Sequence, residues 1–125
     1  AGMPRHQIQG PGERGADGAS RVWIERPPNP GELPERAELP LHLEVRAHSP
    51  IGFAWGYGGS GPAQLALALL IDATSNESLS LRHYQEFKRQ FVAGWQDSWR
   101  ITATEIRAFV ATQEKQDSTT PLATV

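Results

Sequence analysis

The sequence contains no cysteine and only one methionine among its 125 residues. The absence of cysteine excludes a disulfide framework, a thiol nucleophile and a thiolate metal site. An excess of one charge is also lacking, because 12 basic residues stand against 14 acidic ones, for a formal charge of -2. This balance gives no overall electrostatic reason to expect nucleic acid or an anionic membrane as the partner. A reducing compartment fits these features, and we expect a cytoplasmic location.

Long hydrophobic runs are missing as well. The longest one, Leu65 to Ile71, is far too short to span a bilayer. The first 20 residues contain no apolar core of a signal peptide, so no membrane association is expected. The length suits one compact domain.

Both ends of the chain are poor in large apolar side chains. Residues 1–20 are rich in glycine, proline and charge, and residues 112–125 are mostly polar. Such segments bury too little surface to offset the entropy lost on ordering. We therefore predict a disordered N-terminal segment (1–20), a single folded domain (21–111) and a disordered C-terminal tail (112–125).

Alternating apolar and polar residues predict strands in the first half of the domain. Arg21–Arg26 is one such segment, and Leu41–His48 shows the cleanest alternation in the chain. Pro27–Pro40 holds five of the ten prolines and is predicted to be a long loop. The spacing of Phe53 and Trp55 is compatible with a short third strand.

A nearly unbroken apolar segment follows a glycine-rich stretch. Pro62 is typical of the first turn of a helix, so Gly61 is expected to be the N-cap and Pro62 the first helical residue. Ala63–Ala73 consists of strong helix formers and is apolar on nearly every side. This pattern predicts a central, buried helix.

The second half of the domain is expected to be helical. Apolar residues recur every three or four positions over Glu77–Ala93, which predicts an amphipathic helix capped by Asn76 or Ser78. Thr102 and Glu105 have the spacing of a capping box and predict a short third helix. A brief strand is expected just before it, at Trp99–Ile101. The fold class is therefore α+β, with a small antiparallel sheet of two to four strands packed against about three helices.

Two stretches resemble a known family. Gly52 to Leu70 matches the pattern Gly-Phe-x-Trp-Gly-Tyr-Gly-Gly-Ser-Gly-Pro-Ala-Gln-Leu-Ala-Leu-Ala-Leu-Leu, and Tyr84 to Lys88 matches a following Tyr-Gln-x-Phe-Lys element. Both are similar to an uncharacterised domain family of bacteria, phages and integrative or conjugative elements. The resemblance covers roughly Arg21 to Val110. It implies a compact bacterial cytoplasmic domain on mobile DNA and supplies no catalytic residues.

The glycine-rich stretch is open to two interpretations. In the first, Gly58 and Gly59 let backbone amides converge, and the free amides of Ala63 and Gln64 hold a phosphate or carboxylate with help from Ser60. In the second, the glycines only allow left-handed geometry and close packing beneath the neighbouring aromatic rings. The lysine of a phosphate-binding P-loop is missing, and no second strand completes a dinucleotide-binding unit. We favour the structural interpretation.

No pattern points firmly to catalysis or to a metal. His6, His42, His48 and His83 lack metal-ligand spacing, and no acidic cluster joins them in the sequence. His42 and His48 are expected on a solvated strand face. Ser60 departs from a nucleophile elbow because Pro62 stands where glycine is required.

A basic patch is a further alternative. It would consist of Arg82, Lys88 and Arg89 together with Arg46 and Arg100. Glu86 lies within pairing distance of two of these residues along a helix, which favours a solvated helix face over a nucleic-acid site.

The leading hypothesis is a small non-enzymatic binding or regulatory domain without a cofactor, acting on a protein partner. The alternatives are a phosphate- or nucleotide-binding protein or small enzyme that uses the Gly58–Gln64 segment, and a DNA-binding regulator that uses the second helix. The candidate binding residues lie in the glycine-rich loop and on the nearby strand: Arg46, His48, Trp55, Tyr57, Gly58, Gly59, Ser60 and Gln64. No catalytic residue, metal ligand or oligomeric state is assigned.

Overall fold

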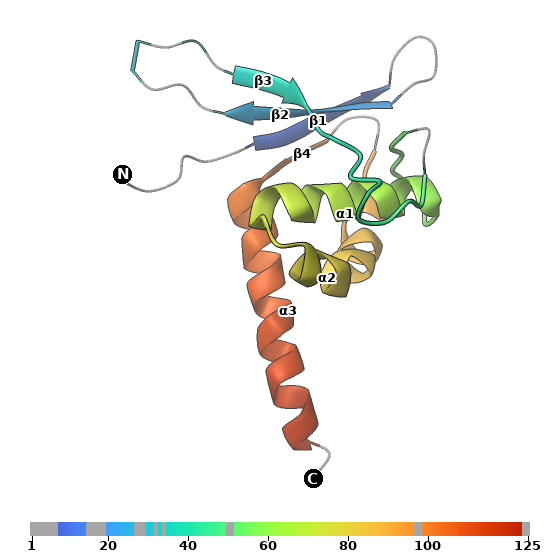
Figure 1. The fold of residues 1–125 in the computed structure, drawn as a ribbon, viewed down its shortest axis with the longest axis vertical. Coiled ribbons are helices and arrows are strands. Elements are labelled where there is room, and N and C mark those ends of the chain that lie inside the picture. Colours follow the sequence, from blue (N-terminus) through green and yellow to red (C-terminus); the bar gives the residue numbers. More distant parts are fainter. Residues whose placement is uncertain are drawn as a thin grey trace.

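The computed structural model describes residues 8–14, 20–26, 30–31, 33, 35–49, 52–96 and 99–123. Side chains of 8–14, 20–21, 26 and 118–123 are not described. The described elements follow the order β1 (Ile8–Arg14), β2 (Ser20–Arg26), β3 (Glu35–Glu38), α1 (Ser60–Thr74), α2 (Glu77–Gln90), the 3-10 turn η1 (Val92–Gly94), β4 (Trp99–Thr102) and α3 (Ala103–Ala123). Figure 1 shows the sheet on one side of α1, α2 on the other, and α3 extending away from both.

The sheet has the strand order β3-β2-β1-β4, and each neighbouring pair is antiparallel. β1 joins the two halves of the sheet because it pairs with both β2 and β4. The register shifts between Gln9 and Gly12 on both sides, and this irregularity accommodates Pro11, which cannot donate to a ladder. Residues 8–14, which lie within the segment predicted to be disordered, thus form a strand in the structure. The amino-acid composition of this segment does not predict β1, because the strand is held by backbone pairing with β2 and β4.

The strand predicted at Arg21–Arg26 is confirmed by β2. Val22 and Ile24 are buried toward the helices, whereas the Trp23 ring lies 4.5 Å beneath the Arg36 guanidinium of β3. β3 corrects the prediction that Pro27–Pro40 is entirely loop. Its four residues are all exposed, so pairing with β2, rather than an apolar face, holds it in the sheet.

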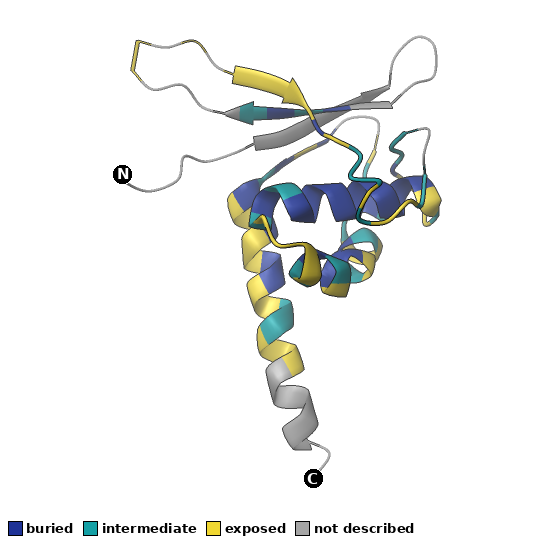
Figure 2. Cartoon of the chain, in the orientation of Figure 1, coloured by how far each residue is buried: buried dark blue, intermediate teal, exposed yellow. Residues whose placement is uncertain are grey.

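The central helix is confirmed. Twelve of the 15 residues of α1 are buried, because α2 and α3 pack against it and the buried side chains of the sheet belong to the same core. Figure 2 shows it as the most continuously buried element of the domain. Its start differs from the prediction, since the helix begins at Ser60 and Gly59 is the N-cap. Pro62 is the third helical residue, where an amide would have no helical acceptor in any case.

The amphipathic second helix is confirmed with a slightly earlier end, at Gln90. The side chain of its N-cap, Asn76, accepts a hydrogen bond from the Leu79 amide at 3.0 Å. The helix tightens into η1 before Gly94, and the aromatic rings of Phe87, Phe91 and Trp95 pack together at this end.

The strand and capping box near residue 100 are also confirmed. The Thr102 hydroxyl accepts from the Glu105 amide at 3.1 Å, and a Glu105 carboxylate oxygen accepts from the Thr102 amide at 3.0 Å. The helix that follows is much longer than predicted, because α3 continues through most of the segment expected to be disordered. Residues 111–116 are mainly good helix formers, and Glu114 contacts α2.

The α+β fold class is therefore confirmed, with the helices on one face of an antiparallel sheet. Two predicted strands are wrong. Leu41–His48 forms a turn-containing loop, and Phe53–Trp55 is irregular. None of the helices in the described part of the chain combines the length and apolar character needed to cross a bilayer.

Candidate functional site

The loop at residues 41–49 is organised by one buried side chain, that of Gln64 on α1. Its Oε1 accepts hydrogen bonds from the amides of His48 (2.6 Å) and Ser49 (3.0 Å). Its Nε2 donates to the carbonyls of Leu41 (2.6 Å) and Arg46 (3.0 Å). All four hydrogen-bonding positions of the amide are used. The main chain here therefore bonds to a helix side chain instead of a neighbouring strand, which is why the alternating pattern does not form one.

His48 fixes the same loop to α2. Its Nε2 lies 2.6 Å from the Tyr84 hydroxyl, and the two rings are 5.4 Å apart. Burial lowers the pKa of His48, and the nearby charges of Arg46 and Lys88 lower it further. The neutral imidazole and the Tyr84 hydroxyl thus share one hydrogen bond, and the imidazole tautomer decides which of them donates.

His48 is expected to titrate below the ordinary histidine pKa of 6.5. Because the unfolded chain takes up the proton first as pH falls, the stability contributed by neutral His48 is present above pH 6.5 and is lost below it. Ring proton shifts followed by NMR, assigned with His48→Gln, measure this pKa. Lys88→Met should move it upward, and a value at or above 6.5 in the unsubstituted chain would contradict the expectation.

The glycine-rich loop leads into α1 through close packing. The Gly56 amide donates to the Val92 carbonyl at 3.0 Å, and its φ of 88° is a geometry that suits glycine. The Tyr57 ring folds over the start of α1, and a Cβ added at Gly59 would lie 2.8 Å from it. At Gly61 an added Cβ would lie 2.6 Å from the Cβ of Ala54. These contacts support the structural interpretation of the glycines.

Neither amide of the predicted anion cradle belongs to the first turn, whose amides lack helical acceptors. The Ala63 amide already donates to the Gly59 carbonyl at 3.0 Å, and Gln64 lies one residue further into the helix. Trp55, which the sequence analysis lists as a candidate binding residue, is not accessible to a partner. It is fully buried, donates from Nε1 to the Gln96 carbonyl at 2.7 Å, and meets the Trp99 ring edge-on.

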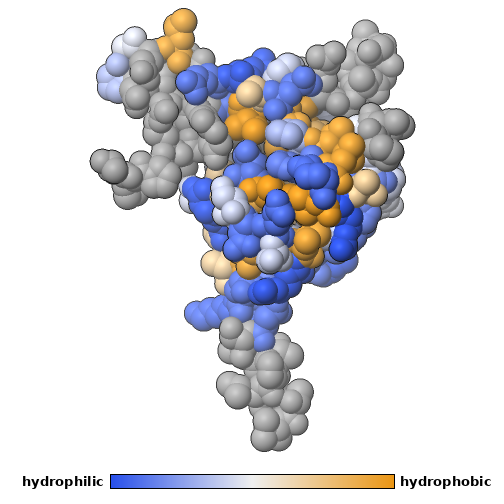
Figure 3. Space-filling model, in the orientation of Figure 1, coloured by the Kyte–Doolittle hydropathy of each residue, from blue (hydrophilic) through white to orange (hydrophobic). Residues whose placement is uncertain are grey.

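An open hollow of about 380 Å³ lies between the glycine-rich loop and α2. Gly58 forms one side, and the other lining residues come from α2 and η1: Gln85, Glu86, Lys88, Arg89 and Ala93. Tyr57, just before Gly58, is 53% exposed and is one of two large hydrophobic residues with high exposure in the described chain. Figure 3 shows apolar surface gathered over α1 and the loop that crosses it, with hydrophilic surface around it.

The charges around the hollow are partly paired. Glu86 accepts hydrogen bonds from Gln90 and Arg89, which lower the pKa of its carboxyl. Among the described residues, Lys88 and Arg46 have no carboxylate partner. The hollow therefore combines a paired acid with the Lys88 ammonium, and Arg46 adds positive charge near His48.

The structure brings together part of the predicted site. Gly58 lies against α2, and Gln64 holds the backbone of Arg46 and His48, whereas Ser60 is exposed at the helix start. Of the lining residues on α2, the sequence analysis names Lys88 only as part of a basic patch and gives no signal for Gln85. That patch is not continuous, since Arg82 pairs with Glu114 and Arg100 lies 3.8 Å from Glu25.

A second cluster was missed. His83 of α2 meets Glu114 and Asp117 of α3, a group with three ligand atoms suited to a metal ion. The prediction that no acidic cluster joins a histidine is therefore wrong for His83. The partners are 31 and 34 residues away in sequence, so only helix packing brings them together. His83 and Arg82, through their hydrogen bonds, lower the pKa of Glu114. His6 lies outside the described residues.

The fold and the hollow define a small α+β domain built around a buried central helix, with a preformed surface beside that helix's start. The chain belongs to the family of unknown function DUF6166, whose model matches residues 12–112. This match confirms the resemblance to a family without an assigned activity. Comparisons with curated proteins and with solved structures gave no match.

Proposed function

We propose that this chain is a non-enzymatic binding domain that docks an acidic segment of a protein partner. The docking surface consists of Arg46, Tyr57, Gly58, Gln85 and Lys88. The observation that carries the proposal is an exposed tyrosine that precedes Gly58, the residue of the glycine-rich loop that lines the hollow opposite α2. Tyrosine is enriched at protein interfaces because its ring buries a large area while its hydroxyl keeps a hydrogen bond.

The charge of this surface supports an acidic partner. Lys88 and Arg46 both lie close enough to His48 to lower its pKa, so they contribute positive potential to one region. Glu86, the acid at the hollow, is occupied by Arg89 and Gln90. A carboxylate-rich segment would therefore meet net positive charge.

The rigidity of the supporting loops also supports docking. Gln64 fixes the 41–49 loop through four hydrogen bonds, and the Gly56 amide fixes the glycine-rich loop to η1. A surface ordered in advance costs less entropy on binding. We place the partner in the cytoplasm of a bacterial host or among the proteins of a mobile element, because the sequence resemblance implies that setting.

The test is quantitative affinity capture from a bacterial extract, with bound proteins compared across variants. Tyr57→Ala is expected to weaken the specific partner by about 2 kcal/mol, roughly 30-fold, as is typical of an interface hot spot. Lys88→Glu should weaken it as well, by opposing an acidic ligand.

Lys115→Glu is the matched control, since Lys115 is an exposed lysine on α3, outside the docking surface. Circular dichroism establishes that each variant is folded. If the same proteins are retained by all three variants, the docking surface is not the binding site.

The alternatives give different outcomes. A phosphate or nucleotide at the start of α1 would raise the melting temperature in a ligand panel, since a ligand at 100 times its Kd adds about 2.7 kcal/mol. DNA binding through α2 would show steep salt dependence in a mobility assay. The bonded Ala63 amide and the paired Arg82 and Arg89 make both less favoured than protein docking.

A further inference from the structure

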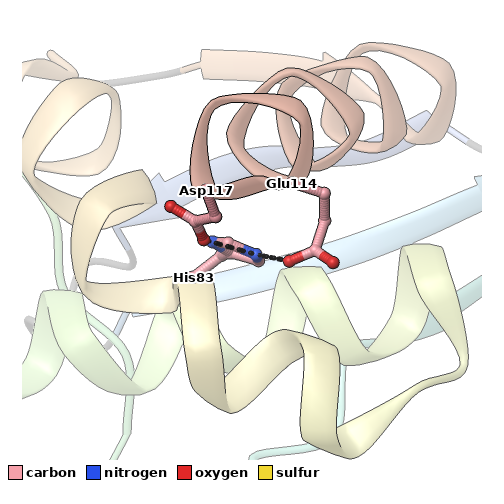
Figure 4. Close-up of side chains that lie close together, drawn as sticks. All are labelled: His83, Glu114 and Asp117. Atoms are coloured by element: carbon pink, nitrogen blue, oxygen red, sulfur yellow. Dashed lines mark hydrogen bonds and ion pairs between the residues drawn. The ribbon is translucent and has the colours of Figure 1, made fainter. Parts of the chain in front are cut away.

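Three side chains able to bind a metal meet where α2 and α3 pack together. His83 comes from α2, and Glu114 and Asp117 come from α3 (Figure 4). Glu114 and Asp117 are three residues apart on the helix, so both carboxylates lie on the face that meets His83. The three potential ligand atoms all lie within 4.8 Å of one another.

The distances are close to those of a coordination sphere. His83 Nε2 is hydrogen-bonded to Glu114 Oε2 and lies 3.9 Å from Asp117 Oδ2. Ligand atoms about 2.0–2.2 Å from a tetrahedral Zn²⁺ are roughly 3.4 Å from one another. Metal binding would require Glu114 Oε2 to move away from His83 Nε2 and Asp117 Oδ2 to move slightly closer to it.

The environment of each ligand also suits a metal. His83 is only 3% exposed, and its imidazole is directed from the core toward the two acids. The Glu114 and Asp117 carboxylates are half-buried and exposed, respectively. A fourth coordination position of a bound ion would therefore be open to water. Arg82 donates to both oxygens of Glu114 at 2.9 and 2.7 Å, and such outer contacts commonly orient a ligating carboxylate.

We propose that His83, Glu114 and Asp117 bind one divalent transition-metal ion. One imidazole nitrogen with two carboxylate oxygens is a donor set that Zn²⁺ accepts, and Co²⁺ and Mn²⁺ are the related candidates. The ion would connect α2 to α3 at the point where α3 leaves the core, since most of residues 111–117 are exposed (Figure 2). This site is separate from the docking surface.

Titration of the full chain with Zn²⁺ and with Co²⁺, by calorimetry and by the visible Co²⁺ spectrum, tests the proposal. One ion is expected per chain, with tetrahedral Co²⁺ absorption. Asp117→Asn replaces a carboxylate ligand by a neutral amide at an exposed position and should weaken binding at least tenfold. His83→Ala should abolish it.

His48→Gln and His42→Ala are the matched controls, because each removes a histidine away from the cluster. Both should leave the affinity unchanged. The proposal is overturned if no saturable binding occurs, in which case the cluster is an ion-pair network only. It is equally overturned if Asp117→Asn, shown to be folded, binds as tightly as the unsubstituted chain.

Discussion

Gln64→Leu is expected to lower the free energy of unfolding by about 3 kcal/mol, because it leaves buried backbone groups without partners. Leucine has a similar size and helix propensity, so packing and helix formation change little. The amides of His48 and Ser49 and the carbonyls of Leu41 and Arg46 would all lose their hydrogen bonds. Urea unfolding measures the loss, and faster hydrogen exchange at residues 41–49 locates it.

The control for this substitution is Gln85→Leu, the same change at an exposed position of α2. It should alter the stability by less than about 0.5 kcal/mol. A loss below about 1 kcal/mol for Gln64→Leu would mean that water replaces the Gln64 amide and that the loop does not depend on it. Because Gln64 supports the backbone of Arg46, a loosened loop should also weaken capture of the partner.

Gly61→Ala is expected to destabilise the domain by about 2 kcal/mol, although alanine favours a helix over glycine by about 1 kcal/mol. The new Cβ would lie 2.6 Å from the Cβ of Ala54 and 3.2 Å from its backbone nitrogen. The backbone at Ala54 cannot move freely, since Trp55 beside it is fully buried and Gly56 is bonded to Val92. Thermal or urea unfolding measures the net effect, and its sign shows whether packing outweighs propensity.

Gly58→Ala is the matched control, because a Cβ there meets no atom within 4 Å. It should be nearly neutral. Ala54→Gly combined with Gly61→Ala should recover part of the loss, since it removes the closest contact and leaves the backbone one. Stabilisation by Gly61→Ala alone would show that the start of α1 can shift, and that these glycines are not required for close packing.

The candidate site was predictable in part. The sequence singles out the glycine-rich stretch, and the structure places Gly58 at an open hollow and leaves Tyr57 exposed. The lining residues from α2 were read only as a polar helix face, because the approach of α2 to the loop depends on packing. Gln64 was expected to offer its amide to an anion, whereas its side chain holds a neighbouring loop. A single glutamine carries no sequence signal for that role.

The sequence by itself determined the elements whose signals are local. The buried apolar helix, the amphipathic α2, the Asn76 cap and the Thr102–Glu105 capping box follow from residue propensities and short spacings, and these the structure bears out. Local pattern also indicated β2 and β4, whereas tertiary structure alone decided the remaining strands. A strand requires a neighbouring strand to pair with. Ile8–Arg14 pairs with β2 and β4, whereas Leu41–His48 is not paired and forms a loop. Tertiary structure also brought His83 together with Glu114 and Asp117. Contacts between residues more than 30 positions apart depend on how the helices pack, and no local sequence pattern indicates them.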